Sequence, residues 1–473
     1  MAGWNLEHTY SELPEIFFRE QFPAFVRSPK MVVFNEKLAG TLGLDADKLR
    51  EAPGMFAGSE LPPGAKPIAQ AYAGFQFGHF AMLGDGRAVL LGEQLCPDGR
   101  RFDIQLKGSG VTPFSRNGDG LAALAPMLRE YIISEAMFHL GIPTTRSLAV
   151  VLTGKGVIRD GLKQGAVLTR VAASHIRVGT FNFISAYGTE DDLRKLADYS
   201  IRRHFPWLEG EKDKYLLLFR QAADRQASLI SKWQLAGFVH GVMNTDNMAI
   251  SGETIDYGPC AFMDIYDPQT VFSSIDTMGR YSYENQPKIG AWNLARLAEA
   301  MLPLFNGHHD EAVKLAQNSI AIYWDNYNRY WLTGMRLKLG LADEEPDDTG
   351  LISALLDLMK RYELDYTNTF RALANDLFMP ETHEITAWNK EWRARIDRRH
   401  CDISDAFDLM NKHNPAVIPR NRHVEEALAA AESGDLTLMH SLLDALGRPY
   451  EESRLFSTPP EPALCGYKTF CGT

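Results

Sequence analysis

The spacing of hydrophobic residues changes near residue 180, from the period of two that is typical of strands to the period near 3.6 that is typical of helices. Residues 102–107 alternate strictly between hydrophobic and polar side chains, and residues 88–92, 147–152 and 166–170 are short apolar runs. Within this first part the helical period occurs over residues 121–140, which end at a Gly-Ile-Pro sequence. We therefore expect a strand-rich segment that contains one helix.

After residue 180 the helical period dominates. It predicts helices over residues 191–203, 212–237, 292–301, 309–339 and 350–362. A strand-like stretch at residues 248–256 interrupts them, and we expect it to form a two-stranded hairpin. The chain is thus expected to have an α+β fold, in which a smaller strand-rich lobe precedes a larger helical lobe.

Changes in composition mark the expected boundaries of these parts. A segment rich in proline and glycine ends the first 65 residues, and the last residues of the chain are polar and rich in proline. We expect an N-terminal extension, a strand-rich lobe, a helical lobe and a C-terminal tail, over residues 1–65, 66–180, 181–447 and 448–473.

Composition and charge exclude several classes of protein. The 473 residues include 49 Lys and Arg and 60 Asp and Glu, a net charge of −11, which argues against a general nucleic-acid-binding protein. No apolar run of about 18 residues predicts a membrane span, and the first residues lack the pattern of a targeting segment. Five scattered cysteines fit neither a disulfide framework nor a zinc site, so we expect a cytoplasmic protein.

A glycine-rich turn precedes the strand at residues 88–92. Gly84 and Gly86 would let the backbone approach a phosphate group closely, and Arg87 adds a positive charge. The turn is not a dinucleotide-binding fingerprint, because a strand and not a helix follows it. The alternative interpretation is an ordinary hairpin turn.

Lys107 ends the alternating strand on its polar side. A lysine at the end of a strand in a cleft can hold phosphate oxygens, and Glu130 in the next helix could orient it, as in kinase-like folds. The simpler interpretation is that both side chains face water. Asp119 would most simply cap the helix, and Gly120 would close its turn.

Arg170 and Arg177 lie seven residues apart after the strand-like runs. Two guanidinium groups near a glycine-rich loop suit the phosphate tail of a nucleoside triphosphate. The alternative interpretation is ion pairing at the surface.

The most informative segment is residues 240–258, which contain a polar Asp-Asn loop, the expected hairpin and an Asp-Tyr-Gly turn. Mg²⁺ bound to nucleotide phosphates takes one or two oxygen ligands from the protein, and Asn247 and Asp256 could supply them. Asp246 would then be free to accept a proton from an attacking hydroxyl group. His240 is interpreted as a structural residue, because nothing pairs it with a nucleophile.

Several long strings of the sequence resemble one family. They are residues 72–79 (YAGFQFGH), 106–110 (LKGSG), 113–116 (PFSR), 174–179 (SHIRVG), 240–248 (HGVMNTDNM), 279–282 (GRYS) and 414–420 (NPAVIPR). On these strings the chain resembles the selenoprotein O family, nucleotidyltransferases once called pseudokinases, along nearly its whole length. The resemblance implies a protein-kinase-like bilobal fold that transfers AMP from ATP to hydroxyl groups of proteins on Ser, Thr or Tyr, including the enzyme itself. UMP transfer from UTP is a second reaction that it implies, with Mg²⁺ or Mn²⁺ as the metal.

The resemblance also implies roles for individual residues. It makes Asp246 the proton acceptor, Asn247 and Asp256 the metal ligands, and Glu130 the partner of Lys107. The nucleotide contacts that it implies are Gly84, Gly86, Arg87, Lys107, Asp119, Gly120, Arg170, Arg177 and Asp256.

The family carries a redox residue at the third position from the C-terminus, which is Cys471 here. A partner cysteine of the family often precedes the Gly-Arg-Tyr-Ser string, where this chain has Phe272. Cys260 or Cys465 could replace it, or Cys471 could remain a reduced thiol.

Two other functions compete with nucleotidyl transfer. A conventional phosphotransferase is one, although Asp246 and Asn247 are adjacent, whereas four residues separate the corresponding pair of protein kinases. A catalytically inactive nucleotide-binding scaffold is the other, although every group needed to handle a metal and phosphates is present in order.

Overall fold

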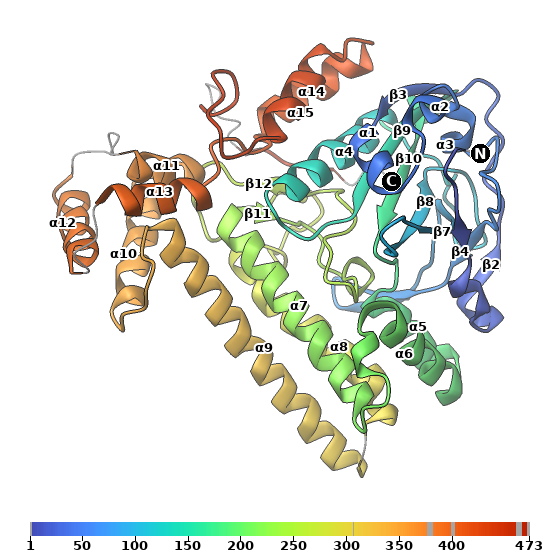
Figure 1. Ribbon diagram of the computed structural model, residues 1–473, viewed down its shortest axis with the longest axis horizontal. Helices are drawn as coiled ribbons and strands as arrows, with labels where there is room; N and C mark the ends of the chain where they lie inside the picture. The colour runs from blue at the N-terminus through green and yellow to red at the C-terminus, as the bar shows by residue number, and fades with distance from the viewer. Residues whose placement is uncertain (1, 306, 376–381, 399–402, 460–465, 471–473) are drawn as a thin grey trace.

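The computed structural model describes residues 2–305, 307–375, 382–398, 403–459 and 466–470. Its strand-rich part lies on one side of the molecule and its helical part on the other (Figure 1). The fold is therefore a mixture of helices and strands with the two kinds largely segregated along the chain, as the α+β prediction requires.

One antiparallel sheet forms the centre of the strand-rich part. Its strand order is β2-β4-β7-β8-β10-β9-β3, and β1 pairs with β7. The strands are β1 (Leu6–Glu7), β2 (Phe18–Glu20), β3 (Lys30–Phe34), β4 (Ile68–Gln70), β7 (Ala88–Leu95), β8 (Arg101–Lys107), β9 (Arg146–Ile158) and β10 (Leu162–Ala172). The four strand-like runs of the sequence are thus confirmed, and residues before 66 add three further strands to the same sheet.

In strand β8 both the hydrophobic face and the polar face of the alternating sequence are buried. Ile104 and Leu106 are fully buried in one apolar core, which also contains residues of the short helices α1 (Glu36–Thr41), α2 (Ala46–Arg50) and α3 (Pro53–Ala57). The polar residues of the other face are buried as well, since Asp103, Gln105 and Lys107 are 3%, 0% and 5% exposed. The interpretation that Lys107 faces water is therefore wrong, and the polar face of β8 lines a charged interior.

Helix α4 (Leu124–His139) packs against β9 and β10 and is buried over most of its surface. It begins three residues later than the sequence predicts, and Ala123 occupies its N-cap position without a side-chain cap. Asp119 therefore does not cap the helix. Its carboxylate instead accepts hydrogen bonds from Arg159 and from the backbone N–H of Leu121.

The helical part is built around α7, α8 and α9, which pack side by side and run diagonally across Figure 1. Predicted helices α6, α7, α9 and α10 are confirmed to within two residues at each end, whereas α8 begins six residues earlier than expected. The helices are α5 (Val178–Tyr187), α6 (Glu190–His204), α7 (Lys214–Ala236), α8 (Gln286–Met301), α9 (His309–Lys338), α10 (Asp348–Arg361), α11 (Tyr366–Ala374), α12 (His383–Asp397), α13 (Ile403–His413), α14 (Asn421–Glu432) and α15 (Thr437–Leu446). No helix of the described ranges is long and apolar enough to cross a membrane.

The predicted hairpin at residues 248–256 does not form. Its two limbs pair with different segments: Ile250 N–H donates to the carbonyl of Ile176, and Thr254 N–H donates to the carbonyl of Pro143. The two limbs are joined by a turn that contains Gly252. The prediction was wrong because short β-like runs do not reveal their partners, but the segment still connects the Asp-Asn loop to Asp256.

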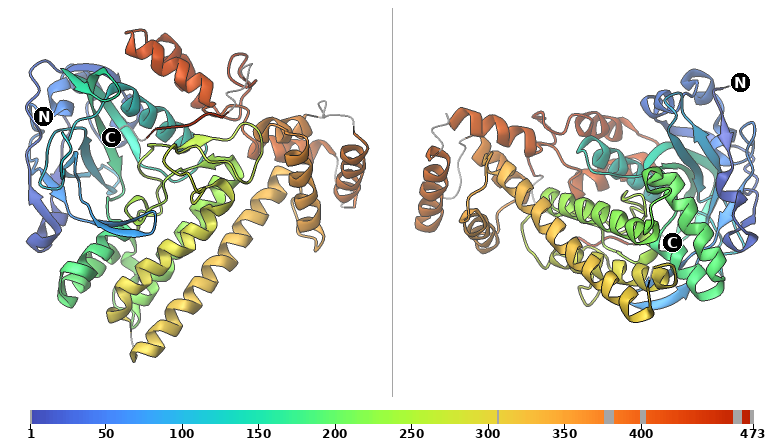
Figure 2. Two further views of the ribbon diagram at one scale, coloured as in Figure 1. Left: turned by 180° about the vertical axis from the view of Figure 1, so that it is seen from behind. Right: turned by 60° about the horizontal axis from the view of Figure 1, so that its bottom comes forward.

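A small hairpin leaves the main sheet and lies against the helical part. It consists of β5 (Ala73–Gln76) and β6 (His79–Met82), which form a separate two-stranded sheet. Strand β5 contacts α5 and the short 3₁₀ helix η4 (Thr245–Asn247). The light-blue segment near α5 in Figure 2 is this region, so the hairpin brings residues of the strand-rich part to the Asp-Asn loop.

Candidate functional site

A cleft of about 490 Å³ opens where the strand-rich part meets the Asp-Asn loop. Residues from four separated segments line it: the β5 region with the glycine turn, the loop before α4, Arg159 after β9, and the loop that follows α7. Six residues singled out from the sequence are on its walls: Gly84, Gly86, Arg87, Asp119, Gly120 and Asp246. The sequence therefore predicts the walls of one cavity from positions more than 160 residues apart.

Close packing explains the two glycines of the turn. A β-carbon on Gly84 would be 2.4 Å from the ring of Phe114, and one on Gly86 would be 2.9 Å from the Phe114 carbonyl oxygen. Gly84 also has a φ of +127°, which side chains other than glycine rarely adopt. The turn thus lies against the loop before α4 and presents its backbone to the cleft.

Three buried charged groups and the partly exposed Asp256 form a cluster beneath the cleft. Lys107 Nζ donates to Glu130 Oε2 at 2.6 Å and to Asp256 Oδ1 at 2.5 Å. Arg170 Nη2 contacts the same Asp256 oxygen at 2.7 Å and Glu130 Oε1 at 2.9 Å. The structure therefore brings together the predicted lysine–glutamate pair and adds Arg170 and Asp256 to it.

The charge state of Asp256 follows from this cluster. Burial opposes its ionisation, but Lys107, Arg170 and Arg177 outweigh burial and hold the pKa of Asp256 well below its usual range. The residue also has a φ of +65°, which is uncommon outside glycine. A side chain held as an anion on a constrained backbone is suited to a fixed electrostatic role.

Arg177 lies between Asp256 and Asp246 at the N-terminus of α5. Its Nη1 donates to the backbone carbonyl of Asp246 at 2.9 Å and is 3.8 Å from Asp256 Oδ2. Its guanidinium group stacks over the ring of Tyr72, 4.3 Å from the ring centroid. The predicted alternative of surface ion pairing is wrong for both arginines, because Arg170 and Arg177 are each only 2% exposed.

Asp246 lies in the wall of the cleft with an unsatisfied carboxylate. It is 8% exposed, and its buried Oδ1 has no hydrogen-bond partner among the residues that the structure describes. Burial raises the pKa of Asp246 to about 6, while Arg177 opposes that rise. A carboxylate that borders a cavity and has an unused oxygen can accept a proton from a bound hydroxyl group.

Backbone contacts fix the loop that carries Asp246 and Asn247. Asn247 Nδ2 donates to the Val242 carbonyl at 3.0 Å, which uses the nitrogen of the amide and not its oxygen. His240 is fully buried, with Nε2 bonded to the Ile255 carbonyl and Nδ1 bonded to the N–H of Val242. The two ring nitrogens of His240 thus link the backbone at Val242 to the backbone at Ile255. This is the structural role expected from the sequence.

The candidate metal ligands are oxygen donors of this loop and of the charged cluster. Within the described parts of the chain no group of three or more His, Cys, Asp or Glu side chains is arranged to hold a metal. An amide oxygen with one carboxylate is nevertheless the donor set that Mg²⁺ takes when substrate phosphates and water complete its shell. Asn247 and Asp256 supply these two kinds of oxygen donor, and Asp256 is held in its anionic form by its cationic neighbours.

The sequence did not single out several residues of the cleft. Arg159, at the end of β9, donates from Nη1 and Nη2 to the two Asp119 oxygens at 2.8 and 3.0 Å. Other lining residues that the sequence analysis did not select are Tyr72, Gln76, Phe114 and Arg116. Arg116 belongs to the sequence string PFSR, which was an available signal for it. Its φ of +55° is a conformation found in turns.

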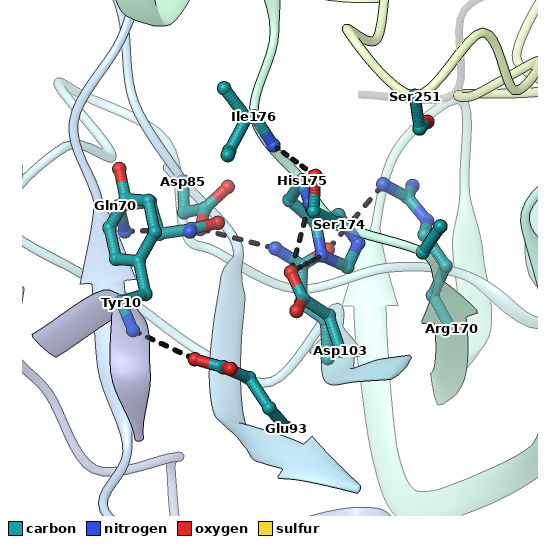
Figure 3. Close-up of polar contacts among 12 residues, drawn as sticks. Tyr10, Gln70, Asp85, Glu93, Asp103, Arg170, Ser174, His175, Ile176 and Ser251 are labelled. Carbon is teal, nitrogen blue, oxygen red and sulfur yellow. Dashed lines mark hydrogen bonds and ion pairs between the residues drawn. The ribbon is translucent and has the colours of Figure 1, made fainter. Parts of the chain in front are cut away.

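A second polar layer lies behind the cleft, in the sheet (Figure 3). His175 Nδ1 is 3.0 Å from Asp103 Oδ2, and the backbone N–H of His175 donates to the same oxygen. On the other side of this layer, Asp85 accepts hydrogen bonds from the Gln70 backbone and the Gln105 side chain. These contacts fix the backbone that leads to Arg177.

The predicted redox residue Cys471, together with Cys465, lies outside the described residues. Cys260 is fully buried, and burial raises the pKa of its thiol to about 12. Phe272 is also buried, and its ring lies 6.1 Å from the ring of Tyr467. A buried thiol with a raised pKa is a weak nucleophile, so Cys260 is poorly suited to disulfide exchange in this conformation.

Comparisons with known proteins decide the family. A family model described as "Protein adenylyltransferase SelO" matches residues 2–447. This chain belongs to the SelO family. Proteins named "Protein nucleotidyltransferase YdiU" are similar to it over nearly their whole length: the one from Brevibacillus brevis is 58% identical and the one from Halalkalibacterium halodurans is 56% identical, each alignment covering 100% of this chain and 98% of the relative. The relative of the same name from Clostridium botulinum strain Eklund 17B is 57% identical, over 99% of this chain and 98% of its own length.

Membership of the SelO family confirms the resemblance noted in the sequence. It identifies the chain as a SelO/YdiU-type protein nucleotidyltransferase, and hence as a transferase. Such an enzyme needs a nucleotide site and an acceptor site that share one reacting centre.

Proposed function

We propose that this SelO-family protein transfers AMP from ATP to hydroxyl groups of protein substrates, including itself. The strand-rich part and the helical part would be the two lobes of a protein-kinase-like fold, with ATP in the cleft between them. Support for this arrangement comes from the cleft itself, which is lined by the glycine turn of one part and by Asp246 of the other.

The observation that carries the proposal is the state of Asp246. Its side chain borders the cleft, burial raises its pKa to about 6, and its Oδ1 has no hydrogen-bond partner among the described residues. A Ser, Thr or Tyr hydroxyl of a substrate bound in the cleft would donate its proton to this carboxylate. Asp246 would accept it as the oxygen attacks phosphorus.

The buried cations suit a reaction at the α-phosphorus. When AMP is transferred, pyrophosphate leaves and negative charge grows on it. Lys107, Arg170 and Arg177 are positioned beneath the cleft, where fixed positive groups stabilise developing charge most strongly. In phosphate transfer the leaving group would be ADP, and deep cations would contribute less.

Asn247 and Asp256 would hold Mg²⁺ or Mn²⁺ together with the phosphates. The bound metal would neutralise phosphate charge and align the phosphates for in-line attack. Asp256 is kept anionic by its three cationic neighbours. Arg87, Asp119 and Gly120 would contact the nucleotide from the other walls of the cleft.

Intact-mass measurement tests this proposal. The full chain, incubated with Mg²⁺ and either ATP or UTP, should gain the mass of AMP or of UMP, and a parallel incubation with Mn²⁺ compares the metals. A gain equal to one phosphate would instead identify a kinase. No gain on the chain or on any added protein would favour an inactive nucleotide-binding scaffold.

A further inference from the structure

Asp85, the central residue of the glycine turn, points away from the cleft. Gly84 and Gly86 line the cavity, whereas Asp85 does not line it and is only 2% exposed. A buried carboxylate is costly unless it is paired, so its contacts are informative.

The Asp85 side chain connects the turn to the sheet through one oxygen. Oδ2 accepts from the Gln70 backbone N–H and from Gln105 Nε2, each at 3.1 Å. The same Gln105 side chain receives a longer contact of 3.5 Å from Arg170 Nη1. Figure 3 shows Asp85 next to Gln70. One oxygen therefore ties the glycine turn to the neighbourhood of Arg170.

The other oxygen faces Arg177. Asp85 Oδ1 is 3.9 Å from Arg177 Nη2 and has no hydrogen-bond partner within the described parts of the chain. On its other side the Arg177 guanidinium lies 3.8 Å from Asp256 Oδ2. Arg177 is thus held between two carboxylates at nearly equal distances, and loss of either charge would draw it toward the other.

We propose that Asp85 is a positioning residue. It holds the Arg177 guanidinium group away from Asp256 and fixes its position relative to the backbone of the glycine turn. Arg177 would then remain available to the phosphates of the nucleotide, and Asp256 would remain available to the metal. This inference rests on the proposed function, because it assigns Asp85 a role at the same site. Burial raises the pKa of the Asp85 carboxyl group, and the Arg177 charge opposes that rise. The electrostatic interaction between the two side chains therefore needs both of them.

A double-mutant cycle tests the inference. Asp85→Asn keeps an oxygen that can accept from Gln70 and Gln105, and it removes the charge that faces Arg177. In the wild-type background it should lower kcat for AMP transfer about tenfold, because a displaced guanidinium stabilises the leaving group poorly. In the Arg177→Ala background the same substitution should change kcat less than about twofold, since the group that it positions is gone.

An equal loss of kcat in both backgrounds would overturn the inference, because it would mean that Asp85 only stabilises the fold. No loss in either background would overturn it as well. Asp348→Asn is the matched control, since Asp348 is a buried carboxylate that pairs with Arg336 and Arg395 in the helical part, and its effect should be the same in both backgrounds.

A binding measurement separates this inference from the proposed function. The Kd of an ATP analogue with a methylene group between the α- and β-phosphorus is measured by calorimetry for the same four proteins. If the effects of the Asp85 and Arg177 substitutions on Kd are not additive, but the wild type transfers no AMP, the inference would stand and the proposed function would be refuted. If the wild type transfers AMP, but the two substitutions are additive in both kcat and Kd, the proposed function would stand and the inference would be refuted.

If Asp85→Asn does not fold, Gln105→Met replaces it in the cycle. This variant removes the side chain that holds Asp85 Oδ2 while it preserves volume. It should lower kcat in the wild-type background and not in the Arg177→Ala background. Equal effects in the two backgrounds would again overturn the inference.

Discussion

Gly74 lies so close to Asp246 that a side chain in its place would displace the Asp246 carboxylate. A β-carbon on Gly74 would be 2.1 Å from Asp246 Oδ1 and 2.7 Å from Asp246 Cγ. Gly74 belongs to β5, and the neighbouring Phe75 donates its N–H to the hydroxyl oxygen of Thr245 at 2.9 Å. The small hairpin of the strand-rich part therefore sets the position of the carboxylate that we propose to accept the proton.

Gly74→Ala should displace Asp246 and lower kcat for transfer by about two orders of magnitude, because a misplacement of about 1 Å can cost that much. The free energy of unfolding should fall by only about 1–3 kcal/mol, as expected for overpacking. Transfer kinetics and urea unfolding of the same protein measure the two effects. Gly40→Ala is the control, since Gly40 has no atom within 4 Å of the added carbon. Wild-type kcat in Gly74→Ala would contradict the assigned position of Asp246.

Asp256→Asn should abolish transfer and also reduce stability. The amide cannot replace the charge that Lys107 and Arg170 contact at 2.5 and 2.7 Å, so the free energy of unfolding should fall by about 2–3 kcal/mol. Asparagine tolerates the φ of +65° at this position, so the backbone is not the cause of the loss. Transfer assays with increasing Mg²⁺ or Mn²⁺ and thermal unfolding test it. Activity restored by high metal with unchanged stability would refute the dual role of Asp256.

Arg159→Ala should raise KM for ATP several-fold, which corresponds to a loss of about 1 kcal/mol of binding free energy, and should leave kcat nearly unchanged. Arg159 binds Asp119 and the Leu121 carbonyl, so its loss loosens one wall of the cleft without touching the reacting groups. Arg100→Ala is the matched control, because Arg100 pairs with Asp98 in the turn between β7 and β8, which does not line the cleft. Steady-state kinetics of both variants decide the matter. A similar KM for the two variants would show that the Arg159–Asp119 pair does not shape the nucleotide site.

Lys338 predicts a pH dependence of stability. It is 3% exposed at the end of α9, its Nζ lies 4.2 Å from the ring centroid of Phe370, and burial lowers its pKa to about 7. The unfolded chain binds more protons than the folded chain between pH 7 and the usual pKa of lysine, so this group makes stability rise with pH in that window. Lys338→Met should therefore be more stable than the wild type at pH 7.

The advantage of Lys338→Met should shrink by about 2 kcal/mol between pH 7 and pH 9, because one pKa unit corresponds to 1.36 kcal/mol. Urea unfolding of the two proteins at both pH values measures the difference, in which other titrating groups cancel. A difference that stays constant with pH would mean that Lys338 is charged in the folded chain.

Local pattern predicted much of the fold, but not the long-range pairing. Alternation at residues 102–107 identified β8, yet it could not show that the polar face is buried, since that depends on Glu130 and Asp256 from distant segments. The run at 248–256 has strand-like residues and failed as a hairpin, because its limbs bond to residues 143 and 176 instead of to each other. The later helices α11–α15 were not predicted. The residues of β5 and β6 showed no pattern that identified them as strands.

Residue type and spacing selected six residues that line one cleft, and the roles assigned to them stay predictions. Asp246 and the glycine turn carry their chemistry in residue type and spacing, and the structure places both on one cleft. Asp119 was interpreted as a helix cap because capping is local, and only the structure could reveal its pairing with Arg159. Gly74 gave no signal, since a glycine that makes room for a distant carboxylate looks like any other glycine in a strand.

The most direct test of the central claim follows the position of a label in ATP. The full chain is incubated with Mg²⁺ and ATP labelled either at the α-phosphate or at the γ-phosphate, alongside Asp246→Asn and Arg177→Ala. The account predicts that the α-label becomes attached to protein and the γ-label does not. It also predicts that each substitution lowers the labelling by about two orders of magnitude. Attachment of the γ-label, or undiminished α-labelling by Asp246→Asn, would contradict it.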